Sequence, residues 1–140
     1  MNQTTAAVAM TFINLPVADL PRTMTFYKAL GFTFNSQFSD ATAAAMVINP
    51  TTFAMLLTHP KFDGFTTRPR PDAAATTGAL FALSLPGKAA VDAMMAAAIA
   101  AGGTEYRPTT DLGFMYGRAF ADPDGHVWEP FWMNASFAQS

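Results

Sequence analysis

The order of strand-like and helix-like segments occurs twice along this chain, and that repeat limits the possible folds more than any other feature. Residues 9–59 and residues 78–134 both follow the order strand, helix, strand, strand, strand. A Pro- and Thr-rich connector, Pro60–Thr77, joins them without a predicted element of its own. The repeat predicts an α+β fold of two βαβββ modules. Each sheet is expected to lie under its own helix, with the free faces forming a cleft.

In the first module, the helix has recognisable ends. Asp19 suits the N-cap, Pro21 the first turn, and Gly31 the position after the last turn. The strands expected around this helix are Ala9–Val17, Thr33–Ser39, Ala43–Ile48 and Thr52–Thr58.

In the second module, a helix is expected over Lys88–Ala101, ended by a Gly-Gly pair. The sequence Asp-Pro-Asp-Gly at 122–125 predicts a tight hairpin turn before the last strand. The strands expected here are Gly78–Leu85, Glu105–Asp111, Phe114–Ala121 and His126–Met133.

Composition narrows the class of protein. The chain has 140 residues, of which 51% are hydrophobic, so residues 1–140 are expected to form a single domain. It contains no cysteine and starts without a signal-like segment, which favours a cytoplasmic location. Its longest apolar stretch, Ala89–Ala101, is too short to span a membrane. The net charge of −2 and the scattered basic residues argue against nucleic-acid binding.

Three stretches resemble one known superfamily: NLPVADLPRTMTFYKALGF at 14–32, ALSL at 82–85 and DPDGHVWE at 122–129. In these the chain is similar to the vicinal-oxygen-chelate superfamily of glyoxalases, bleomycin-resistance proteins and extradiol dioxygenases, and in particular to its glyoxalase-like subgroup. The resemblance covers nearly the whole chain. It implies paired βαβββ modules around a U-shaped, mixed-sheet cleft. In the metalloenzymes of the superfamily, His and Glu side chains bind one divalent ion there.

The resemblance also indicates where the metal ligands would fall. The four positions are Phe12, Leu80, Leu56 (or its neighbours Met55 or Leu57) and Glu129. Only Glu129 can bind a cation, and the two histidines and the other glutamate are not placed to replace the rest. We therefore expect no metal and no other cofactor.

Without a metal, Glu129 needs another positive partner. If Asp122 pairs with Gly125 at the turn, Arg118 lies opposite Glu129 and Tyr116 shares their face. A bulge at the turn would shift this register. The predicted ion pair suits a purely structural role as well as the binding of an acidic or phenolic ligand.

Several more residues are candidate ligand contacts. Asn14 has the strand parity of Phe12, and Gln37 is a polar residue on a predicted strand. With Tyr116, Arg118 and Glu129 they would supply polar contacts, and Phe12, Leu56 and Leu80 would supply an apolar wall.

These residues favour a non-enzymatic protein of the bleomycin-resistance type that binds a small apolar or aromatic ligand. The resemblance implies that it is a homodimer. Two alternatives stay open. One is a metal-dependent lyase or isomerase of the lactoylglutathione-lyase (glyoxalase I) type. The other is a metal-independent enzyme with Glu129 as catalytic base.

Overall fold

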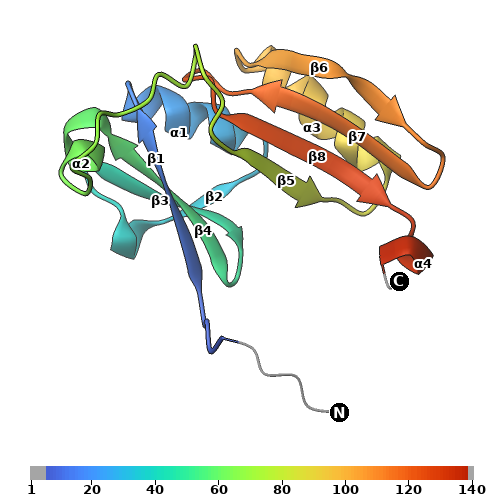
Figure 1. Ribbon diagram of the computed structural model, residues 1–140, viewed down its shortest axis with the longest axis horizontal. Coiled ribbons are helices and arrows are strands. Elements are labelled where there is room, and N and C mark those ends of the chain that lie inside the picture. Colours follow the sequence, from blue (N-terminus) through green and yellow to red (C-terminus); the bar gives the residue numbers. More distant parts are fainter. Residues whose placement is uncertain (1–5, 139–140) are drawn as a thin grey trace. The chain divides into compact units, whose positions relative to one another are not determined.

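The computed structural model describes residues 6–138 and divides the chain into two compact units. One unit comprises the N-terminal segment up to Leu20 together with Phe32–Pro69. The other comprises Pro21–Gly31 and the chain from Arg70 onward. Each unit contains one four-stranded mixed sheet, as the repeat predicts (Figure 1). The fold class is therefore α+β, with two sheets and helices.

The first sheet has the strand order β1-β4-β3-β2. Strand β1 runs parallel to β4, and the other neighbours are antiparallel. The helices of this unit are short: a 3₁₀ helix, η1, and α2, which contacts β1 and β4. The elements are β1 (Thr11–Val17), β2 (Thr33–Asn35), η1 (Ser36–Phe38), β3 (Ala43–Asn49), β4 (Thr52–Thr58) and α2 (His59–Asp63).

Two of these elements differ from the prediction. Strand β2 ends at Asn35 because the Asn35 side chain accepts a hydrogen bond from the backbone N–H of Gln37, which starts η1. Gln37 therefore lies on a 3₁₀ helix rather than on a strand. The predicted connector is also not without structure, because α2 occupies its first residues.

The second sheet has the same topology, with the order β5-β8-β7-β6 and β5 parallel to β8. Helix α3 packs against β6, β7 and β8 (Figure 1), and buries Val91, Met95 and Ala98 at helical spacing. The elements are α1 (Leu20–Ala29), β5 (Leu80–Ser84), α3 (Lys88–Ala100), β6 (Thr104–Asp111), β7 (Met115–Ala121), β8 (Val127–Met133) and α4 (Ala135–Ala138).

Helix α1 packs with the second unit, although the sequence places it in the first repeat. The Phe26 ring lies 6.0 Å from the Phe120 ring, and the Tyr27 ring lies 5.8 Å from the Trp128 ring. All four side chains are buried. The prediction that each helix covers the sheet of its own repeat is right for α3 and wrong for α1.

The β7–β8 hairpin differs by one residue from the predicted register. Tyr116 pairs with Trp132, not with Phe131. By the same register Arg118 and Glu129 point to opposite faces of the sheet, because adjacent positions on a strand alternate. The prediction that Arg118 lies opposite Glu129 is therefore wrong.

The turn itself explains the shift. The backbone N–H of Asp122 donates to the carbonyl of His126, so the loop contains one residue more than predicted. Gly125 takes a left-handed φ of +102°, and an added Cβ would lie 2.5 Å from the carbonyl oxygen of Ala73. Only glycine fits this position without a change in the neighbouring backbone.

No helix within residues 6–138 is long and apolar enough to cross a membrane.

Candidate functional site

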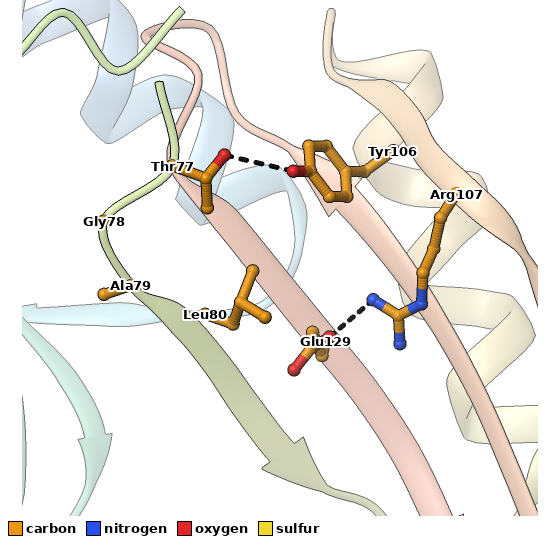
Figure 2. A pocket seen from close by; sticks show the side chains of 7 residues that line it. All are labelled: Thr77, Gly78, Ala79, Leu80, Tyr106, Arg107 and Glu129. Atoms are coloured by element: carbon orange, nitrogen blue, oxygen red, sulfur yellow. Dashed lines mark hydrogen bonds and ion pairs between the residues drawn. The ribbon is translucent and has the colours of Figure 1, made fainter.

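A pocket of about 600 Å³ lies on one face of the second sheet (Figure 2). Its lining comes from the end of the connector, from β5, from β6 and from β8. The lining residues are Thr77, Gly78, Ala79, Leu80, Tyr106, Arg107 and Glu129. All of them belong to the second unit, so that unit forms the pocket by itself.

An ion pair lies at one end of the pocket. Nη1 of Arg107 donates to Oε2 of Glu129 at 2.5 Å. The Glu129 side chain is 20% exposed and that of Arg107 is 36% exposed, so the pair is partly screened by solvent.

Small residues make room for this ion pair in the sheet. Arg107 pairs with Ala119 of β7, and Glu129 pairs with Ala82 of β5. The register of β7 and β8 places Ala119 across from Glu129. The register therefore places only the small Ala119 side chain between Arg107 and Glu129. Figure 2 shows the long Arg107 side chain reaching Glu129 on β8.

Bulges in β6 turn Arg107 toward the pocket. Glu105 pairs with Phe120 but Arg107 pairs with Ala119, so Tyr106 is an extra residue in the ladder. Without this bulge, Glu105 and Arg107 would share a face. With it, Glu105 lies on the face of α3 and Arg107 on the face of the pocket.

A contact between two polar side chains lies elsewhere in the pocket lining. The hydroxyl groups of Thr77 and Tyr106 lie 3.0 Å apart, which links the connector to β6 (Figure 2). Leu80, which is 52% exposed, also lines the pocket. The pocket therefore combines an aromatic ring and an apolar side chain with one charged pair.

Of the predicted site residues in the second unit, Leu80 and Glu129 come together in the pocket and two others do not. Arg118 lies on the opposite face, where it forms ion pairs with Asp92 at 3.0 Å and Glu105 at 2.9 Å. The Tyr116 hydroxyl donates to the same Asp92 carboxylate at 2.7 Å.

This second polar cluster has its own electrostatics. Hydrogen bonds from Tyr116 and then Arg118 lower the pKa of Asp92. The same hydrogen bond raises the pKa of Tyr116, and the bond to Glu105 is the main cause that raises the pKa of Arg118. The cluster attaches α3 to β6 and β7 and has no access to the pocket.

The predicted site residues of the first unit do not form a common site within their sheet. Phe12 is 45% exposed and stacks on Phe53 at 5.0 Å, and Asn14 is exposed on the same face. Leu56 pairs with Leu15, so it lies on the other face, where it is fully buried. Gln37 is exposed on η1.

A buried Asp–Tyr pair lies elsewhere in the second unit. The Tyr27 hydroxyl of α1 donates to Oδ2 of Asp122 at 2.5 Å. Oδ1 of Asp122 accepts backbone N–H groups of Asp124, Gly125 and His126. Burial raises the pKa of Asp122, and burial followed by the Asp122 charge raises the pKa of Tyr27. As predicted, Asp122 is a turn-forming residue, and it also anchors α1.

The side chains present do not suit the divalent cation of the superfamily's metalloenzymes. Within the part of the chain that the structure describes, no three His, Cys, Asp or Glu side chains are grouped to hold a metal ion. Phe12, Leu56 and Leu80 offer no donor atom, and Glu129 is bound to Arg107.

Sequence reasoning missed Arg107 and Tyr106 and the connector residues of the pocket. The alternation of side chains along a strand could not assign Arg107 to the pocket, because the bulge reverses the face of the sheet on which Arg107 lies. Pro108, inside the β6 segment, is the one local signal of a bulge.

Comparisons with known proteins agree with this fold. The family model described as Glyoxalase/Bleomycin resistance protein/Dioxygenase superfamily matches residues 9–129. No curated protein sequence matches.

Among solved structures, a hypothetical protein from S. aureus is 26% identical, with a TM-score of 0.76 and 94% of each chain covered. A glyoxalase/bleomycin resistance protein/dioxygenase family enzyme from Burkholderia phytofirmans PsJN has a TM-score of 0.74 and 17% identity over 91% of this chain and 99% of that one. The fosfomycin resistance protein FosX from Mesorhizobium loti has a TM-score of 0.64 and 15% identity over 100% of both chains. At 17% and 15% identity, the last two show a shared fold.

Proposed function

The chain belongs to the glyoxalase/bleomycin resistance protein/dioxygenase superfamily, and on this premise we propose that it binds a small apolar or aromatic molecule without a metal ion. The binding site in this proposal is the pocket of Leu80, Tyr106, Arg107 and Glu129. A concave site with an apolar lining and few polar groups is typical for such ligands.

One observation carries the proposal: the Glu129 carboxylate is bound to Arg107. By the family resemblance, Glu129 stands where the metalloenzymes have a metal ligand. The guanidinium supplies the positive charge that a cation would otherwise supply. The neighbouring family position, Leu80, adds an apolar side chain to the same pocket.

Elemental analysis tests the metal-free part of the proposal. The purified chain, dialysed after exposure to zinc, nickel, iron and manganese, should retain far less than one equivalent of any of them. One equivalent retained per chain would contradict the proposal, because that stoichiometry requires a real ligand set.

Ligand binding is tested separately with indole as a neutral aromatic probe. Indole should shift the backbone NMR signals of Gly78, Leu80 and Glu129. The variant Leu80→Glu should lose these shifts, whereas Leu112→Glu should keep them, since Leu112 is equally exposed (55%) but lies outside the pocket. Binding that survives Leu80→Glu, or no binding at all, would refute the proposed site.

A second candidate function is metal-independent proton transfer by Glu129. Its support is the position of a carboxylate inside a pocket with an apolar wall. The glyoxalase I reaction is not expected, because polarising its substrate requires a metal ion and the side chains do not suit one. Turnover of the methylglyoxal–glutathione hemithioacetal after addition of divalent metals would reverse this assignment.

The proposal includes a cytoplasmic homodimer. A run of exposed apolar side chains, Val8, Met10 and Phe12, leads into the edge strand β1 and offers surface for association. Light scattering should give twice the mass of the chain. A monomer at all concentrations would contradict the dimer without affecting the pocket.

A further inference from the structure

The ion pair in the pocket is joined through one atom on each side. Nη1 of Arg107 bonds Oε2 of Glu129. Among residues 6–138, neither Oε1 of Glu129 nor Nε and Nη2 of Arg107 has a protein hydrogen-bond partner. The two side chains thus offer a free acceptor and free donors next to each other, on a wall of the pocket.

The charges of the pocket wall cancel. An anionic ligand that bonds Arg107 would come close to the negative charge of Glu129, and a cationic ligand that bonds Glu129 would come close to Arg107. A neutral group with one donor and one acceptor meets neither repulsion. It can satisfy both free sides of the pair at once.

The rest of the lining favours a flat ring attached to such a group. The Tyr106 hydroxyl is engaged by Thr77, which holds the end of its side chain, and Leu80 adds an apolar surface (Figure 2). Gly78 and Ala79 also line the pocket and, being small, leave space for a ligand beside Tyr106 and Leu80. An aromatic ring is the ligand shape that gains most from contact with a second ring and a leucine.

We propose that this pocket selects a neutral planar ring compound that carries a hydrogen-bond donor and an acceptor side by side, as in an aromatic amide or a lactam. The acceptor of the ligand binds Arg107 and its donor binds Glu129. This inference rests on the proposed function, since it names the ligand class of the same pocket.

Four probes of nearly equal shape test the proposal by NMR titration of the full chain. Benzamide carries a donor and an acceptor, and acetophenone carries the acceptor only. Benzoate is an anion, and benzamidinium is a cation. Benzamide should bind at least about fivefold more tightly than each of the others, because each of those leaves one member of the pair unsatisfied or repelled.

Charge-neutralising variants should change this preference in a defined way. Glu129→Gln removes the negative charge beside Arg107, so benzoate should become the tightest-binding probe. Arg107→Gln removes the positive charge beside Glu129, so benzamidinium should become the tightest-binding probe. Arg118→Gln, on the other face of the sheet, should keep the wild-type order.

The outcomes separate this inference from the proposed function. If all four probes shift Gly78, Leu80 and Glu129 with similar affinity, the pocket binds aromatic ligands but does not select an amide, and the inference is overturned. If no probe shifts these signals up to its solubility limit, the proposed aromatic-ligand site is overturned as well. Should a variant fail to fold, the wild-type order of the four probes still decides.

Discussion

Arg107 of β6 and Glu129 of β8 form an ion pair across the strand that separates them. Ala119 of β7 lies between them in the register. Side chains two strands apart are normally too distant to bond directly, because neighbouring strands are roughly 4.8 Å apart. An arginine is long enough to make this contact when the intervening side chain is small. This wall of the pocket thus depends on Arg107, Ala119 and Glu129, one residue on each of β6, β7 and β8.

A double-mutant cycle should detect this contact. Arg107→Gln and Glu129→Gln should each destabilise the fold slightly, with a coupling energy of about 0.5–1 kcal/mol, as expected for a partly exposed pair. Urea unfolding of the wild type, both single variants and the double variant measures it. The matched cycle of Arg118→Gln with Glu129→Gln should show no coupling within error. Coupling of Arg118 to Glu129 would contradict the register given above.

Gly125→Ala should destabilise the fold by about 2–4 kcal/mol, because it combines a left-handed backbone with a close approach of Ala73. Gly31→Ala is the matched control. Gly31 has a similar φ of +98°, but nothing lies within 4 Å of an added Cβ, so about 1–2 kcal/mol is expected. Thermal unfolding of both variants gives the comparison. Equal losses would show that the contact with Ala73 has no energetic weight.

Tyr27→Phe should cost about 1–3 kcal/mol at pH 7, because it leaves a buried carboxylate oxygen of Asp122 without its donor. Tyr116→Phe removes a similar bond to Asp92, whose side chain is 51% exposed. Water replaces that bond, so the second variant should lose less than about 0.5 kcal/mol. Chemical denaturation of the two variants tests the difference. A Tyr27→Phe variant as stable as wild type would show that the hydrogen bond between Tyr27 and Asp122 does not hold α1 in place.

The stability of the Asp122→Asn variant relative to wild type should depend on pH. Burial raises the folded-state pKa of Asp122 above 3.8, so the stability that its protonated form contributes is present below pH 3.8 and is lost as the pH rises through the folded-state pKa. The asparagine does not titrate, so over that range the free energy of unfolding of the variant should rise relative to that of wild type.

Asp40→Asn is the control of opposite sign. Hydrogen bonds from Thr42 lower the pKa of Asp40, so its contribution is present above pH 3.8 and is lost as the pH falls through the folded-state value. The free energy of unfolding of wild type should therefore rise relative to that of Asp40→Asn as the pH rises. Unfolding curves from pH 2 to 7 measure both differences. A difference for Asp122→Asn that stays constant over this range would contradict the raised pKa.

The sequence was sufficient to predict the strands and the two longer helices, but not the short helices η1, α2 and α4 or the exact pairing of the strands. Alternating apolar residues and end signals placed β4 at its observed bounds and most other elements within about two residues. The hairpin at Asp122 was also predicted. Its register depended on whether Gly125 pairs or takes a left-handed conformation, and a local pattern does not decide that.

The site was predicted only in part, for the same reason. Glu129 and Leu80 were identified through the family resemblance, and both line the pocket. The partner of Glu129 was predicted to be Arg118 and is Arg107, because one extra residue in the turn and one in β6 reversed the faces of both arginines. Such single-residue irregularities follow from tertiary packing rather than from strand periodicity.

The packing of α1 on the second sheet has a consequence for the order in which the chain can fold. Tyr27 and Asp122 are 95 residues apart, so a ribosome has made most of the chain before α1 can meet its partner. Until β7 and β8 emerge, the apolar side of α1 lacks the sheet that it covers in the folded chain. Closing so long a loop also carries a larger entropic cost than closure within one repeat. The duplication visible in the sequence therefore does not coincide with the two compact units of the folded chain.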